Sequence, residues 1–143
     1  MKTLFRIAII MSLLFAGSNY YAHITEKKIE DTLSTTEQIQ PLRKGTFVSK
    51  NSFHKSSGTV LEYQSDGNRT LRFEDFYVKN GPMLRVMFAK EGDISSSVTI
   101  AKLKGNSGNQ NYVVPKDIDA AAFDTILIYS KLLRTIFSTA TLR

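Results

Sequence analysis

The chain has 143 residues, no cysteine and a formal net charge of +6, from 19 Lys and Arg against 13 Asp and Glu. This length suits one domain with a short leader, and the lack of cysteine excludes disulfides, thiol nucleophiles and thiolate metal sites. The basic residues are scattered and form no Lys/Arg-rich run of the kind that marks a nucleic-acid surface, so no nucleic-acid partner is expected.

Residues 1–22 have the organisation of a secretory signal. Lys2 and Arg6 make a positively charged start, and residues 7–16 form an apolar stretch too short for an ordinary transmembrane helix. The sequence therefore predicts an apolar leader helix and an extracytoplasmic location, in the periplasm or at the cell surface. The leader is either cleaved or kept as an N-terminal anchor, which would be the only membrane contact. Residues 23–43 are polar and predict a linker.

Residues 44–143 consist of short alternating runs separated by turn residues, which favours one antiparallel β-sandwich or barrel of about eight to nine strands. The predicted strands are residues 45–49, 59–64, 69–78, 84–89, 98–103, 111–114, 125–129 and 134–142. The predicted connections are a hairpin turn at 65–68, turns or loops at 56–58, 90–97 and 104–110, and a helical turn within 117–123. Residues 125–129 are an unbroken apolar run, as expected of a strand buried on both faces.

The stretch at residues 71–89 organises the rest of the domain. Its apolar residues change parity after Glu74-Asp75, and strict alternation in a strand allows this only at a bulge or corner. Asn80-Gly81-Pro82 then predicts a chain reversal, because Asn and Gly tolerate positive φ and Pro removes a ladder donor. The two apolar strands on either side of this turn are expected to pair as the nucleus of an antiparallel sheet.

Three ordered segments resemble motifs of the DM13 domain family, also called the electron-transfer DM13 domain. Residues 71–76 with 80–84 are similar to L-x-x-E-D-F…N-G-P-x-L of the family. Residues 103–112 are similar to its L-K-G-N-x-G-x-Q-x-Y, and residues 126–131, followed by 137–142, are similar to its third motif. The resemblance covers residues 45–143.

Membership of this family would imply a compact extracytoplasmic β-domain. The family's proposed role is redox or electron transfer, through association with haem-binding domains and through a cysteine in the third motif. Here Ser130 occupies the cysteine position, and Tyr129 stands where the family often has Trp. A hydroxyl cannot cycle between thiol, sulfenate and disulfide. Any redox function of this chain would therefore need a bound cofactor.

Two loops, residues 80–83 and 104–111, are the expected working surface, because rigid sheets usually present function on loops. The candidate surface residues are Asp75, Asn80, Gly81, Pro82, Gly105, Asn106, Gly108, Gln110 and Tyr112. Substitution of Asn106 or Gln110 is expected to weaken partner binding without unfolding the domain.

Catalytic and metal sites are not expected. Gly105-Asn106-Ser107-Gly108 is superficially like the surroundings of a serine-protease nucleophile, but it lacks the Asp, and only His23 and His54 exist to serve as a base. His54 is either a haem or metal ligand, together with Met83 or Met87, or simply a solvated side chain in a polar loop. No His/Asp/Glu cluster has metal-ligand spacing.

The sequence thus supports two functional hypotheses. The first is a non-enzymatic, exported module that binds an envelope protein or a surface ligand and needs no cofactor. The alternative is an electron-transfer accessory that uses a bound cofactor such as haem, with Ser130 near its pocket.

Overall fold

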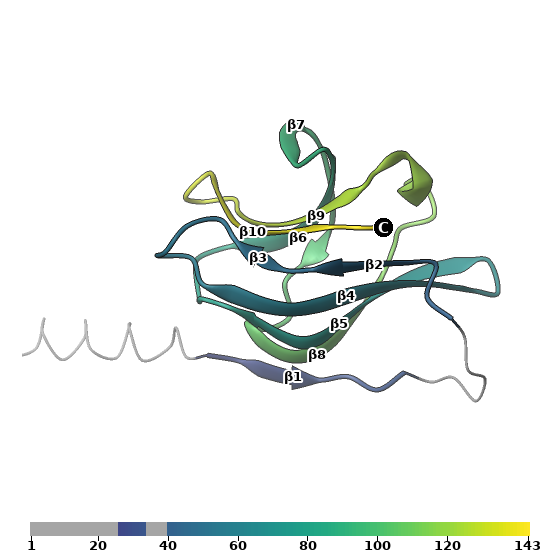
Figure 1. Cartoon of the computed structure of the whole chain (residues 1–143), viewed down its shortest axis with the longest axis horizontal. Helices are drawn as coiled ribbons and strands as arrows, with labels where there is room; N and C mark the ends of the chain where they lie inside the picture. The colour runs from purple at the N-terminus through teal and green to yellow at the C-terminus, as the bar shows by residue number, and fades with distance from the viewer. Residues whose placement is uncertain (1–25, 34–39) are drawn as a thin grey trace, which may run out of the picture.

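Two five-stranded β-sheets pack face to face in the computed structural model, which describes residues 26–33 and 40–143 (Figure 1). The first sheet contains, in spatial order, β1 (Lys28–Glu30), β8 (Ser107–Val113), β5 (Asn68–Val78), β4 (Ser56–Ser65) and β2 (Arg43–Thr46). The second contains β3 (Val48–Ser49), β10 (Thr135–Thr141), β9 (Thr125–Ser130), β6 (Leu84–Lys90) and β7 (Asp93–Lys102). A 3-10 turn, η1 (Ala120–Ala122), precedes β9. The predicted sandwich is confirmed; the predicted leader helix lies outside the described residues.

The core is built from the inward faces of the strands that alternation predicted. Leu71 and Phe73 on β5 and Val86 and Phe88 on β6 are fully buried. β9 lies between β10 and β6, and residues 126–128 of this strand are fully buried as well. The prediction of a strand covered on both faces is therefore confirmed at β9.

The chain changes sheets at Phe47, between β2 and β3. The buried Phe47 ring lies edge-on to the rings of Phe73 and Phe76, at centroid distances of 4.8 and 4.9 Å. The Lys44 N–H donates to the Arg143 carbonyl at 2.8 Å, and the Arg143 N–H donates back at 2.9 Å. These bonds join the two sheets along this side. The single strand predicted over residues 45–49 is therefore replaced by two short strands, β2 and β3.

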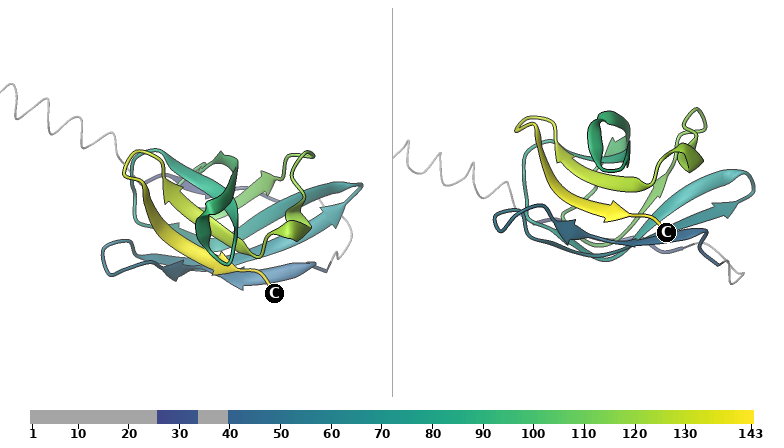
Figure 2. Two further views of the ribbon diagram at one scale, coloured as in Figure 1. Left: turned by 90° about the horizontal axis from the view of Figure 1, so that it is seen from above. Right: turned by 45° about the horizontal axis from the view of Figure 1, so that its top comes forward.

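β5 and β6 belong to different sheets, so the pairing expected within residues 71–89 is wrong. β5 pairs with β4 and β8, whereas β6 pairs with β7 and β9. Asn80-Gly81-Pro82 carries the chain from one sheet to the other. Figure 2 shows the two layers of the sandwich from two further sides. Alternation shows which face of a strand is buried. It does not show to which sheet the strand belongs, because both sheets bury one face in the same core.

The parity change at Glu74-Asp75 is a β-bulge, as predicted. The register of β5 against β8 shifts between Phe73 and Phe76, and Asp75 has a φ of +48°. On the neighbouring strand β4, Gly58 has a φ of +106°, and a Cβ added there would lie 2.7 Å from the Phe76 Cα. The turn predicted around this glycine is wrong, because the segment is the bulged start of β4.

A two-residue turn closes one hairpin in each sheet. Asp66-Gly67 joins β4 to β5 as predicted, and Glu91-Gly92 joins β6 to β7. All four residues have φ between 51° and 76°, which matches the mirror-image turns that suit the twist of a hairpin. The loop predicted over residues 90–97 is wrong from Asp93 onward, where β7 begins.

The region predicted as a linker contributes a strand. β1 runs parallel to β8, with Lys28 opposite Ser107 and Glu30 opposite Asn109. Residues 26–33, which we call the strap, thus cover the outer edge of the first sheet. A Cβ on Gly108 would lie 1.9 Å from the Ile29 carbonyl oxygen, so only glycine permits this approach.

A buried carboxylate ties β4 to two other segments of the chain. Glu62 is fully buried; its Oε2 accepts from Arg43 Nε at 2.6 Å, and its Oε1 accepts from Arg69 Nη1 at 2.9 Å. Arg43 also donates to the carbonyls of Phe123 at 2.6 Å and Ala120 at 3.0 Å, which holds η1 against β2. A buried charge is tolerated only when it is paired in this way.

Glu62→Gln is expected to lower the free energy of unfolding by about 2–4 kcal/mol, because two guanidinium groups lose their counter-charge. Glu74→Gln is the matched control, since that side chain is 41% exposed and lies 3.4 Å from Arg72 Nε. Its expected cost is below about 1 kcal/mol. Urea unfolding followed by circular dichroism measures both, and equal losses would contradict the assigned role of Glu62.

Candidate functional site

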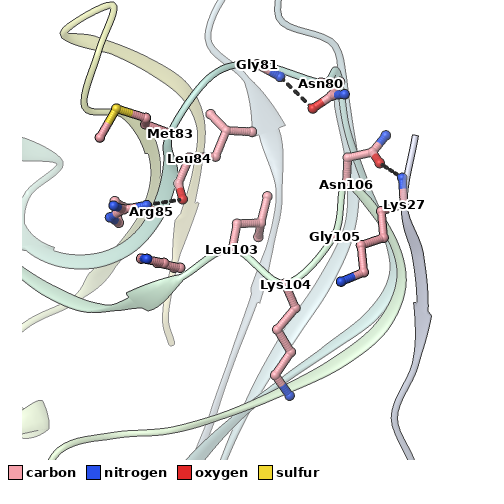
Figure 3. A pocket seen from close by; sticks show the side chains of 11 residues that line it. Lys27, Asn80, Gly81, Met83, Leu84, Arg85, Leu103, Lys104, Gly105 and Asn106 are labelled. Atoms are coloured by element: carbon pink, nitrogen blue, oxygen red, sulfur yellow. Dashed lines mark hydrogen bonds between the residues drawn. The ribbon is translucent and has the colours of Figure 1, made fainter. Parts of the chain in front are cut away.

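A pocket lies where two connections between the sheets run side by side (Figure 3). Residues 79–83 join β5 to β6, and residues 103–106 join β7 to β8. The cavity has a volume of about 260 Å³, slightly below the roughly 300–1,000 Å³ of most small-molecule sites. It is lined by Lys27, Asn80, Gly81, Met83, Leu84, Arg85, Lys102, Leu103, Lys104, Gly105 and Asn106. Its size therefore suits a small ligand group or a partner's side chain.

The pocket brings the two predicted loops together. Asn80 and Gly81 from the first loop and Gly105 and Asn106 from the second all line it. Pro82, which is exposed, lies between lining residues of the first loop.

Two other predicted surface residues lie away from the cavity. The backbone N–H of Asp75 donates to Asn109 Oδ1 at 3.1 Å, and Gly108 lies against the strap. Neither lines the pocket. These two positions shape the bulge and the strap contact.

Backbone bonds connect all three segments that resemble family motifs. The Val78 N–H donates to the Asn106 carbonyl at 2.8 Å, and the Leu103 N–H donates to the Leu84 carbonyl at 3.1 Å. The Lys131 N–H, after β9, donates to the Met83 carbonyl at 3.2 Å. The segments that are separate in sequence therefore meet at one end of the sandwich.

The pocket lining is cationic and contains no carboxylate. Its charged side chains are Lys27, Arg85, Lys102 and Lys104. Lys104 Nζ lies 2.6 Å from Asp31 Oδ2, and this bond, with the Asn111 N–H, holds the pKa of Asp31 below its usual value. The other three cations have no ion pair among the described residues. Uncompensated like charges around one cavity favour an anionic ligand.

Asn106 contributes a buried polar group to this pocket. The side chain is 3% exposed, and its Oδ1 accepts from the Lys27 N–H (Figure 3). The Asn106 N–H donates to the Lys27 carbonyl at 3.0 Å. The Asn106 Nδ2 is buried and has no hydrogen-bond partner within the part of the chain that the structure describes. A buried amide donor without a partner is costly, so a ligand oxygen at this position would be stabilising.

The other asparagines of the second motif hold the strap. Asn109 Nδ2 donates to Glu30 Oε2 at 3.0 Å, and Asn111 Nδ2 donates to the Thr32 carbonyl at 2.9 Å. Arg72 Nη1 donates to the Asp31 carbonyl at 2.6 Å. The sequence assigned Asn109 to a turn. The two-residue spacing of Asn109 and Asn111 could have indicated this role, because it places both side chains on one face of a strand.

Gln110 and Tyr112 lie inside the sandwich. Gln110 Nε2 donates to the carbonyls of Gly105 at 2.8 Å and Ser107 at 3.2 Å, and its Oε1 accepts from the Tyr112 hydroxyl. The Lys104 N–H donates to that hydroxyl at 2.9 Å. Both side chains therefore support the second loop from beneath. A Gln110 substitution would disturb the fold itself.

Ser130, at the position of the family cysteine, is a buried structural hydroxyl. Its Oγ donates to the Pro82 carbonyl at 2.7 Å and accepts from the Leu133 N–H at 3.2 Å. It thus links the β9–β10 connection to the β5–β6 connection. This residue does not fit a thiol-based redox centre, because serine lacks the oxidisable sulfur.

His54 is packed against the protein, so the interpretation of a simply solvated ring is wrong. It stacks on Phe137 with ring centroids 4.0 Å apart, and its Nδ1 is buried without a hydrogen-bond partner among the described residues. No group of three or more His, Cys, Asp or Glu within residues 26–33 and 40–143 is placed to hold a metal ion.

The same residues contain no helix long and apolar enough to cross a membrane.

The family model described as Electron transfer DM13 matches residues 46–142. This match covers most of the chain, and the chain belongs to the DM13 family. It spans the sandwich from the end of β2 through β10. A search of curated proteins and a search of solved structures each returned no match.

Burial raises the pKa of the Tyr112 phenol above its ordinary value of 10.0. The folded protein therefore keeps this proton more tightly than the unfolded chain. The associated stability is present below pH 10 and is lost as the pH rises further, because the unfolded chain then releases the proton. Stability measured against alkaline pH should fall less steeply in Tyr112→Phe than in the original chain. Parallel curves would contradict this assignment.

Ser130→Ala is expected to reduce stability by about 1–2 kcal/mol, because the Leu133 N–H and the Pro82 carbonyl lose a common partner. Ser52→Ala, which removes the hydroxyl of an exposed residue, is the control and should change stability by less than about 0.5 kcal/mol. Thermal unfolding of both variants measures the difference. A neutral Ser130→Ala substitution would contradict a structural role for this hydroxyl.

Proposed function

We propose that this chain is an exported DM13-type module that binds an envelope protein or surface ligand and works without thiol chemistry. The pocket between the two connections carries this proposal. All three motif segments meet beside it, and Lys27, Arg85 and Lys102 give it an uncompensated positive charge. A partner that presents a compact negative group fits both the charge and the buried Asn106 donor.

The alternative is electron transfer with a bound cofactor such as haem, in keeping with the description of the family. His54 is the observation that favours it, since its buried Nδ1 has no partner among the described residues and imidazole is a common haem ligand. The binding function is preferred because the unpaired cations and the buried Asn106 donor all line the pocket where the motif segments meet, whereas His54 does not.

Expression of the full chain in a bacterial host, followed by cell fractionation and intact-mass measurement, tests export and leader cleavage. We expect an extracytoplasmic product that is retained by the envelope. Retention should fall in an Arg85→Gln/Lys102→Gln double variant, because the pocket loses two cations. A Lys44→Gln/Lys116→Gln double variant removes the same charge outside the pocket and should be retained normally.

The visible spectrum of the purified product separates the two functions. A featureless spectrum, unchanged after incubation with haem, is expected for the binding module. A stoichiometric Soret or flavin band would instead favour electron transfer and make His54 the next residue to substitute. A cytoplasmic product, or equal retention of the two double variants, would contradict the proposed function.

A further inference from the structure

The two ends of the sandwich carry opposite charge. Strand pairing places the β3–β4, β5–β6, β7–β8 and β9–β10 connections at one end, which we call the basic end (residues 50–55, 79–83, 103–106 and 131–134). These residues include no Asp or Glu, and the cations that belong to this end are Lys55, Lys79, Lys104, Lys131 and Arg134. Lys50 is not counted with them, because it lines a pocket together with Glu91 and Asp124 of the other end. The connections at the other end carry one lysine, Lys116, and the carboxylates Asp66, Glu91, Asp117, Asp119 and Asp124.

The positive charge of the basic end is mostly unpaired. Lys104 pairs with Asp31 of the strap, and within the strap Glu30 pairs with Lys28. The strap also brings Glu26, whose Oε1 accepts from the Tyr77 hydroxyl at 3.5 Å. The remaining cations of the four connections have no ion pair among the described residues. A net positive surface therefore remains.

Exposed apolar side chains gather at the same end. Phe53 is 75% exposed, Leu132 63%, Leu133 52% and Met83 49%. Phe53 lies in the β3–β4 connection and the two leucines form the tip of the β9–β10 connection. Because β3 pairs with β10, these two tips are neighbours, and Figure 1 shows both at the end opposite η1 and the C-terminus. Four of the large apolar side chains that are exposed among the described residues thus lie at this end, which indicates an interaction surface.

The combination of apolar tips and lysines matches a lipid surface in particular. The apolar groups stand on separate loop tips among cations and do not form one continuous patch. Apolar side chains partition into the boundary between headgroups and acyl chains, and Lys and Arg are drawn to anionic lipids. The strap also enters the domain at this end, since Lys28 lies opposite Ser107, the first residue of β8.

We propose that the basic end docks on an anionic phospholipid bilayer. Phe53, Leu132 and Leu133 enter the interface, and the cations of the same connections lie over the headgroups. The contact uses the folded domain and does not require the predicted leader to be retained. This inference rests on the proposed function only for the cellular location of the module. It adds the surface that the module contacts there.

Single-tryptophan reporters test which end touches the bilayer, because the chain has no Trp of its own. Leu132→Trp places a reporter at the basic end, and Val113→Trp places the matched reporter at an exposed position near the other end. The full chain as purified is mixed with vesicles of phosphatidylcholine alone or with phosphatidylglycerol added. We expect a blue shift of Leu132→Trp emission with the anionic vesicles only, and no shift of Val113→Trp. Added salt should reverse the shift.

Charge variants in the Leu132→Trp background test the lysines. Lys55→Gln/Lys131→Gln should raise the apparent dissociation constant for anionic vesicles about tenfold. Lys44→Gln/Lys116→Gln carries the same charge change away from the basic end and should alter it by less than about twofold. Circular dichroism confirms that each variant is folded.

Three results would overturn the proposal: no vesicle binding by the folded chain, equal shifts of both reporters, or equal binding to neutral and anionic vesicles. If vesicle binding fails while envelope retention still depends on Arg85 and Lys102, the lipid inference is removed and the proposed binding function stands. If vesicle binding succeeds but the product stays in the cytoplasm, the proposed function fails instead.

Discussion

The structure depends on how the backbone satisfies its hydrogen bonds where the chain leaves one sheet for the other. A crossing segment gives up the strand ladder, and each buried N–H and C=O then needs another partner. Here the crossings bond to one another, through Val78 with Asn106 and Leu103 with Leu84. The Ser130 hydroxyl and the Asn106 side chain supply bonds that backbone alone does not. The family motifs fall on these residues, so much of what they encode is the joining of the two sheets.

Two polar networks inside the sandwich serve the same purpose in different ways. The Gln110–Tyr112 pair supports the loop before β8 with neutral groups, and Tyr112 remains protonated at ordinary pH. Glu62 instead uses a full charge between Arg43 and Arg69 to hold η1 against β2. Neutral networks cost less to bury than ionic ones, which need every partner in place. The loop beside the pocket therefore has a rigid, uncharged support.

Much of the fold could be predicted because local patterns determined it. The Asp66-Gly67 turn, the bulge at Glu74-Asp75 and the buried strand β9 all follow from residues adjacent in sequence. The pairing of β5 with β6 was predicted wrongly, since alternation does not identify the sheet to which a strand belongs. β1 is only three residues long, too short for a periodic signal, and its partners lie far along the chain.

The candidate site was predictable in part for the same reason. Loop composition pointed to Asn80, Gly81, Gly105 and Asn106, which do share one pocket. Gln110 was placed on the surface because a polar residue in a polar run gives no sign of burial, yet its amide satisfies the loop from inside. Lys27 reaches the pocket only because the strap binds beside Asn106. No local sequence pattern predicts a contact between two segments so distant in the chain.

The strap also bears on the order in which the protein acquires its structure. Its bonds to Asn106, Asn109 and Asn111 join residues 79 positions apart. Contacts of such long range form only after the intervening chain has been organised, because closing so large a loop costs entropy before any contact compensates for it. Lys27 and its neighbours are made early in synthesis but have no binding edge until β8 exists. The strap is thus expected to dock last, after the other strands of the first sheet have formed.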